Sequence, residues 1–143
     1  GGRSRQSATS ATGAVIVVDT SVWIAALRSR TCSEARVLQQ LLDADEVALA
    51  VPVRLEILGG ASAADRRRLR RALSALPMLY PTDDTWRRLD GWVEQAAASG
   101  QRFGFGDLLI AALAVENGSL VWSLNADFTR METLDLVRCY ASP

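Results

Sequence analysis

Short apolar runs recur along the chain and are separated by longer amphipathic segments. The runs at residues 15–18, 47–51 and 120–122 contain no polar residue and have the length of strands. Because they do not alternate with polar positions, each is expected to be covered on both faces, as parallel strands in α/β proteins are. Residues 78–80 and 136–140 predict two further, shorter strands.

Between the predicted strands, apolar residues recur at helical spacing. The pattern predicts helices over residues 21–27, 33–42, 52–58, 63–76, 82–99 and 107–116, and a short helical turn over 123–128. Pro52 suits the first turn of its helix, Pro77 ends the next one, and Asn117 with Gly118 closes the last. Alternating strands and helices predict a three-layer α/β/α sandwich around a central, mostly parallel sheet of four to five strands, of Rossmann-like type.

The length of 143 residues is that of one domain. Residues 1–13 are rich in Gly, Ser, Thr and Ala, so we expect a disordered tail followed by a single domain over residues 14–143. Cys32 and Cys139 form no metal-ligand spacing, which indicates free thiols in a reducing compartment. No apolar run approaches the roughly 20 residues of a membrane span. We therefore expect a cytoplasmic protein that makes no membrane contact.

The basic residues narrow the possible chemistry, because all sixteen are arginine and the sequence has no histidine. Catalysis by histidine or by a Schiff-base lysine is excluded, as is a P-loop lysine that binds phosphate. Carboxylate chemistry remains. The formal net charge is zero, so any binding of nucleic acid must use a local basic patch or a metal rather than bulk charge.

Four acids stand where the predicted fold brings its loops together. Asp19 follows the first strand, Glu56 lies in the helix after the second, and Asp127 follows the fourth. Asp107 opens a helix that runs antiparallel to the strands, so its N-terminus is expected at their carboxyl edge, where such folds bind ligands. Taken singly, the aspartates could cap helices and the glutamate could face solvent. Together they predict a negative rim.

Clustered carboxylates repel one another unless a cation neutralises them. Oxygen ligands without His or Cys favour a hard cation, and Mg²⁺ or Mn²⁺ suits a site with few carboxylates better than Ca²⁺ or Zn²⁺. Such an ion can hold a phosphate oxygen and lower the pKa of a bound water. The acids therefore predict metal-assisted hydrolysis of a phosphodiester.

The acid motifs resemble, in order and spacing, those of the PIN (PilT N-terminus) domain nucleases, and more narrowly those of the VapC toxins of bacterial toxin–antitoxin pairs. They are VVDTSVW at residues 17–23, VRLEILG at 53–59, GDLLIAA at 106–112 and SLNADF at 123–128. The resemblance implies an endoribonuclease dependent on Mg²⁺ or Mn²⁺. Its catalytic and metal-binding residues would be Asp19, Glu56, Asp107 and Asp127, supported by Ser21, Ser123 and Asn125. The sequence departs from the pattern at Asn125 and Gly106, where many relatives have an acid and an asparagine.

The resemblance also implies a partner, a small cognate antitoxin of the VapB type that holds the nuclease inactive. A negative crevice is readily blocked by a cation, so such an inhibitor is expected to insert an Arg or Lys among the four acids. The alternative function is a non-catalytic PIN-like module that binds RNA or protein. A nuclease assay with and without Mn²⁺ separates the two.

Two surface features leave alternatives open. Arginines crowd residues 66–71 and either form a solvated face or grip RNA, in which case the expected RNA contacts are Arg67, Arg70 and Arg102. The helix over residues 82–99 carries an apolar stripe of Trp86, Leu89, Trp92 and Val93. This stripe is either core or the interface of a homodimer, and we expect two copies of the chain to pair.

Overall fold

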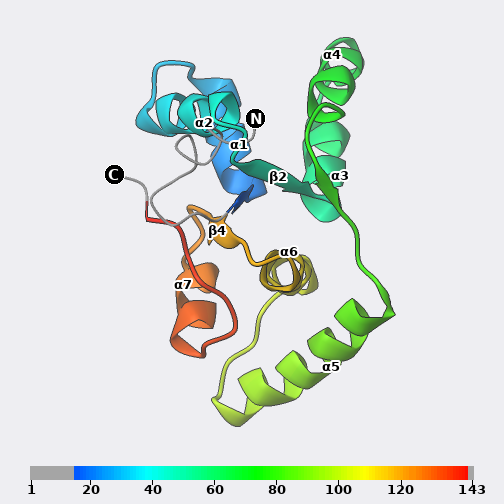
Figure 1. Cartoon of the computed structure of the whole chain (residues 1–143), viewed down its shortest axis with the longest axis vertical. Coiled ribbons are helices and arrows are strands. Elements are labelled where there is room, and N and C mark those ends of the chain that lie inside the picture. Colours follow the sequence, from blue (N-terminus) through cyan, green and yellow to red (C-terminus); the bar gives the residue numbers. More distant parts are fainter. Residues whose placement is uncertain (1–14, 142–143) are drawn as a thin grey trace, which may run out of the picture.

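Four short parallel strands lie at the centre of the computed structural model, which describes residues 15–141 (Figure 1). They are β1 (Ile16–Val18), β2 (Val47–Ala50), β3 (Met78–Leu79) and β4 (Leu120–Trp122), in the order β3-β2-β1-β4. Ile16 of the inner strand β1 is paired with Val47 on one side and with Leu120 on the other. Every residue of β1, β2 and β4 is buried, which explains why these runs lack polar positions.

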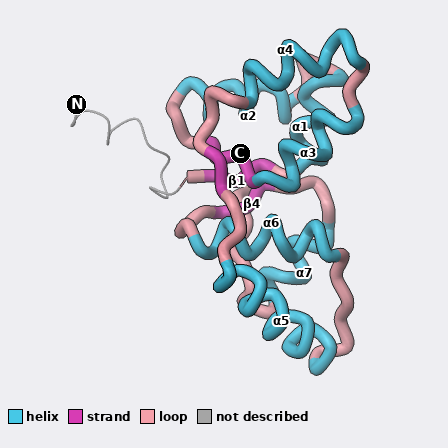
Figure 2. Tube along the Cα trace, turned by 90° about the vertical axis from the view of Figure 1, so that its right-hand side faces the viewer, coloured by secondary structure: helices cyan, strands magenta, loops and turns pink. Residues whose placement is uncertain are grey.

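Helices cover the sheet from two sides (Figures 1 and 2). One side carries α1 (Thr20–Arg28), α2 (Ser33–Asp43), α3 (Val51–Gly60) and α4 (Ala63–Leu73). The other carries α5 (Asp83–Ala98), α6 (Phe105–Glu116) and α7 (Ala126–Thr133). The predicted α/β/α sandwich with a parallel sheet is confirmed. The predicted tail over residues 1–13 lies outside the described residues, and none of the helices within them could cross a membrane.

Several predicted elements end at other residues. The strand predicted at 136–140 is reduced to one parallel bridge between Val121 and Cys139, because only that residue pair is aligned for hydrogen bonding. Helix α4 stops at Leu73, before the predicted end at residue 76, and the Ser74 hydroxyl donates back to the Arg70 carbonyl. Helix α6 begins at Phe105, so Asp107 is its third residue rather than its first.

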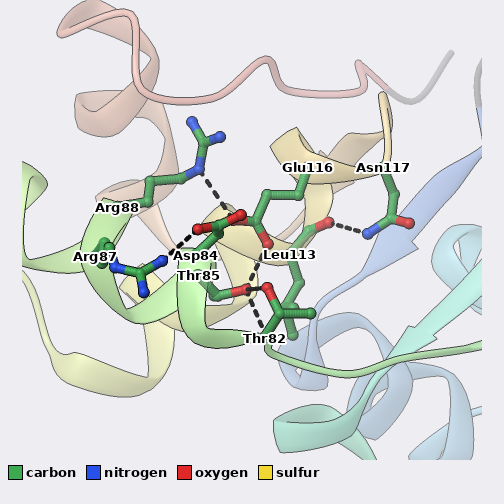
Figure 3. Close-up of polar contacts among 8 residues, drawn as sticks. All are labelled: Thr82, Asp84, Thr85, Arg87, Arg88, Leu113, Glu116 and Asn117. Atoms are coloured by element: carbon green, nitrogen blue, oxygen red, sulfur yellow. Dashed lines mark hydrogen bonds and ion pairs between the residues drawn. The ribbon is translucent and has the colours of Figure 1, made fainter.

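Helix α5 is tied to α6 by a small polar network (Figure 3). The hydroxyl of Thr85, a fully buried residue, donates to Glu116 Oε1 at 2.6 Å. Arg88 Nε donates to the other carboxylate oxygen of Glu116 at 3.1 Å. Thr85 also closes a capping box with Thr82 at the start of α5. Since α6 carries Asp107 near its other end, this network holds the helix that presents that acid.

The apolar stripe of α5 is divided between core and surface. Leu89 and Trp92 are buried, whereas Trp86 and Val93 are 45% and 53% exposed. The Trp86 ring stacks on that of Phe105, with centroids 5.9 Å apart and an interplanar angle of 7°. The stripe is therefore core along one edge, and an apolar surface patch of Trp86, Val93 and Phe105 along the other.

Candidate functional site

Asp19 is the most buried of the four candidate acids. It follows β1 directly, its main-chain N–H donates to the Trp122 carbonyl at 2.8 Å, and its residue is only 5% exposed. Its Oδ2 accepts hydrogen bonds from the hydroxyls of Ser21 and Ser123, both at 2.8 Å. Its Oδ1 accepts none from residues 15–141 and is not sealed from solvent. The protein therefore orients one carboxylate oxygen and leaves the other available.

The two serines that hold Asp19 also fasten the loop after β4. The Leu124 N–H donates to Ser21 Oγ at 3.0 Å, and the Asn125 N–H donates to Ser123 Oγ at 2.9 Å. The end of β1 and the loop after β4 are thereby joined through side chains about a hundred residues apart. Ser21 and Ser123, predicted as supporting residues, thus contact the site directly.

Asn125 connects two further acids. Its Oδ1 accepts the Asp127 N–H at 2.9 Å, which caps α7, and its Nδ2 donates to Asp107 Oδ2 at 3.2 Å. A carboxylate at this position could accept the first bond but could not donate the second. The departure from the family pattern therefore gives Asp107 a neutral donor in place of another negative charge.

The pKa of Asp107 is affected by the other three acids. Its pKa is raised to about 6, chiefly by burial and then, in decreasing order, by the negative charges of Asp19, Asp127 and Glu56, against the lowering effect of the hydrogen bond from the Asn125 amide. Four elements contribute these carboxylates: the end of β1, α3, α6 and α7. The predicted convergence on one rim of the sheet is therefore present as an electrostatic interaction.

The carboxylates do not enclose a finished metal cage. Glu56 is exposed and accepts a hydrogen bond from Thr20 Oγ1 at 2.6 Å, and Asp127 forms an ion pair with Arg130. Within residues 15–141, no three Asp, Glu or Cys side chains stand close enough to surround a metal ion.

The donor set nevertheless fits a hard cation that keeps several of its waters. Each of the four acids has one oxygen engaged by a protein donor and the other free of hydrogen bonds from the described residues. Mg²⁺ is commonly held by only one or two carboxylates together with water, so a closed cage is not required.

Two contacts at the site are not predicted from the sequence. Thr20 orients Glu56 from across the rim, and Arg130 pairs with Asp127. The signal for the second is present, because residues three apart on a helix lie on the same face. The contact of Thr20 with Glu56 depends on how α1 packs beside α3 and has no local signature.

The arginine-rich helix serves two purposes. Arg66 donates to the carbonyls of Leu58 and Ala61, at 3.1 and 2.8 Å, and so satisfies the end of α3. The side chains of Arg67 and Arg70 are exposed and make no hydrogen bond or ion pair with any residue from 15 to 141. The same holds for Arg102 in the loop before α6. The three arginines expected to contact RNA are therefore all accessible.

The raised pKa of Asp107 predicts a pH-dependent stability of the metal-free protein. Because the folded state binds this proton more tightly than the unfolded state, the contribution of Asp107 to the free energy of unfolding falls as pH rises from 4 to about 6 and then stays low. Asp107→Asn is therefore expected to stabilise the EDTA-treated chain near neutral pH, with a gain that shrinks toward pH 4. Urea unfolding across this range checks it. A gain that does not vary with pH would contradict the assignment.

Comparisons with known proteins give a consistent result. The sequence pattern of the PIN domain matches residues 16–134. Ribonuclease VapC11 of Mycobacterium tuberculosis (strain H37Rv) is 32% identical over 119 residues, which cover 80% of this chain and 89% of the relative. VapBC-5, a solved member of the VapBC family of toxin-antitoxin systems from M. tuberculosis, matches with a TM-score of 0.59 and 30% identity over 83% of this chain and 91% of that one. FitAcB from Neisseria gonorrhoeae shares the fold, with a TM-score of 0.71 and 20% identity over 90% and 98% of the two chains.

Proposed function

Since the chain belongs to the PIN domain family, we propose that it is a VapC-type endoribonuclease, the toxin of a bacterial toxin–antitoxin pair, which hydrolyses RNA with the help of a divalent cation. The observation that carries this proposal is a set of four carboxylates from four elements. The charges of three of these carboxylates raise the pKa of the fourth, Asp107. Such a set is electrostatically unfavourable by itself and becomes favourable when a cation binds. The proposed ion is Mg²⁺ or Mn²⁺.

In this proposal the acids have different tasks. Asp19 and Asp107, each oriented through one oxygen by a protein donor, would hold the ion. When bound, the ion supplies a Lewis acid for a phosphate oxygen and lowers the pKa of a water molecule. Glu56 keeps Oε2 free to accept a hydrogen bond from a water at the rim. Ser21, Ser123 and Asn125 fix the geometry of the aspartates.

RNA must reach a rim that is itself negative, so its phosphates need cations elsewhere. We assign this role to the three accessible arginines Arg67, Arg70 and Arg102. A few local phosphate contacts suit a protein with no net charge, whose bulk field does not attract RNA. We place this activity in the cytoplasm.

The proposed protein partner is an antitoxin. Its proposed binding site is a groove between α1 and the α3–α4 pair. The groove is lined by Ile24, Leu27 and Leu69 among others and reaches Glu56. Ile24 and Leu27 are 38% and 49% exposed, which leaves apolar surface for a partner helix. From this groove an Arg or Lys of the antitoxin can enter between the acids and compete with the metal.

Leu27→Glu is expected to weaken inhibition by the cognate antitoxin about tenfold or more, because the new carboxylate would be buried against an apolar helix. RNA cleavage by the variant alone should persist, since Leu27 is outside the acid cluster. Titration of the inhibitor against a fluorogenic RNA measures both quantities. Undiminished inhibition of the variant would place the antitoxin elsewhere.

The exposed patch of Trp86, Val93 and Phe105 supports the proposal of a homodimer. Large exposed aromatic side chains are enriched at protein interfaces. Light scattering of the purified chain at micromolar concentration is expected to give twice the monomer mass. A monomer mass would contradict the pairing and leave the proposed nuclease activity untouched.

The alternative of a non-catalytic binding module differs in one measurable respect. A nuclease converts RNA into shorter fragments with turnover, whereas a binding module retards RNA in a gel and leaves it intact. We expect the purified chain to cleave RNA in Mn²⁺ or Mg²⁺. RNA that is bound yet intact in both ions would favour the binding module.

A further inference from the structure

Arg130 is held beside the acid cluster by two partners. It forms an ion pair with Asp127 one helical turn earlier on α7. Its guanidinium also lies over the ring of Phe103, 5.4 Å from the centroid. Phe103 is buried, at 9% exposure, and belongs to the loop that leads into α6. The Arg130 guanidinium is therefore positioned by the buried Phe103 ring as well as by its ion pair with Asp127.

Asp127 differs from the other three acids because it forms an ion pair. Within residues 15–141, Asp127 is the only one of them that pairs with a basic side chain; the other three accept hydrogen bonds from serine, threonine or asparagine. An arginine keeps its charge at any pH the protein meets. Asp127 is thus the one acid at the rim that is neutralised by the chain itself.

A second divalent ion at Asp127 would face this charge at close range. The ion would have to displace the guanidinium from both Asp127 and the Phe103 ring, or bind beside it against Coulomb repulsion. Asn125, which lies between Asp107 and Asp127, adds no negative charge to compensate. The contacts at this end of the rim therefore oppose a second ion.

We propose that Arg130 is a built-in cation that takes the place of a second metal ion beside Asp127, so that each chain binds one divalent cation. This inference rests on the proposed metal site and adds its stoichiometry and the residue that sets it. Arg130 acts as a positioning residue and does not contact the reacting atoms.

A purely structural role for Arg130 makes a different prediction. If the arginine only joined α7 to the loop before α6, its removal would lower stability and leave the number of bound ions unchanged. The exposed fractions of its ion pair, 49% and 31%, indicate a small stability contribution in either case. Stoichiometry therefore separates the two roles where a melting curve would not.

The test is calorimetric titration of the EDTA-stripped full chain with MnCl₂. Wild type is expected to bind one Mn²⁺ per chain, and Arg130→Gln two. Arg130→Lys, which keeps the charge, should bind one. Arg87→Gln removes a similar i,i+3 ion pair with Asp84 on α5, away from the acids, and should also bind one. Electron paramagnetic resonance of wild type saturated with Mn²⁺ should show isolated ions, a readout that needs no variant to fold.

Two results would overturn this inference alone: a single ion in Arg130→Gln, or two ions or a spin-coupled Mn²⁺ pair in wild type. Two ions in Arg130→Lys would overturn the role of charge. Binding of no Mn²⁺ by wild type and by every variant would instead overturn the proposed metal site, and this inference with it. The failures of the two proposals are therefore distinguishable.

Discussion

Asp19→Asn is expected to reduce RNA cleavage by about a thousandfold or more, which corresponds to about 4 kcal/mol of transition-state stabilisation. The substitution removes the charge of the one acid whose free oxygen the protein positions most firmly, through Ser21 and Ser123. The fold should survive, because asparagine is as good an N-cap as aspartate and its side-chain oxygen can still accept the serine hydrogen bonds.

Initial rates on a fluorogenic RNA in saturating Mn²⁺ measure the loss. Asp84→Asn is the matched control, since it neutralises an exposed acid in the first turn of α5, outside the site. It should cleave at the wild-type rate. Circular dichroism of both variants establishes that they fold. Cleavage by folded Asp19→Asn at the control rate would remove Asp19 from the metal site.

Phe128→Ala is expected to lower the free energy of unfolding by about 3–5 kcal/mol, the usual cost of emptying an aromatic site in a core. Phe128 is 1% exposed and directly follows Asp127, so it anchors the start of α7. Such a loss is a large part of the roughly 5–15 kcal/mol that stabilises a typical domain. Urea unfolding of the metal-free protein gives the value.

Phe105→Ala provides the comparison for this measurement. Phe105 is 63% exposed and contacts Trp86 at the surface, so its truncation should cost much less than that of Phe128. Equal losses for the two variants would mean that α7 is not anchored through Phe128. The position of Asp127 would then depend on other contacts of α7.

Much of the fold follows from local pattern. The apolar runs of β1, β2 and β4 predict buried parallel strands because no polar residue interrupts them. The rim of acids follows in turn, since the carboxyl ends of parallel strands meet at one edge. The bridge at Cys139 marks where pattern fails, because an apolar segment forms a strand only if a neighbour is aligned with it.

Contacts between distant side chains required the structure. Trp86 and Trp92 look alike in the sequence, yet one is exposed and the other buried, because the core covers only one edge of the stripe. From the sequence, Arg130 is expected to be an ordinary surface residue of a short helix. The structure shows that its guanidinium lies over the ring of Phe103. The four acids and the supporting residues Ser21, Ser123 and Asn125 could be proposed from the sequence, whereas the contact of Thr20 with Glu56 and that of Arg130 with Phe103 could not.

The central claim is that the acid cluster binds a divalent cation, through Asp19 and Asp107, without which RNA is not cleaved. Its most direct test is RNA cleavage by chain stripped with EDTA, as Mn²⁺ is restored stepwise and binding is followed in the same samples. The account predicts no cleavage in EDTA, recovery that tracks Mn²⁺ occupancy, and no recovery for Asp19→Asn at any Mn²⁺ concentration. Undiminished cleavage by the stripped wild-type chain would contradict it.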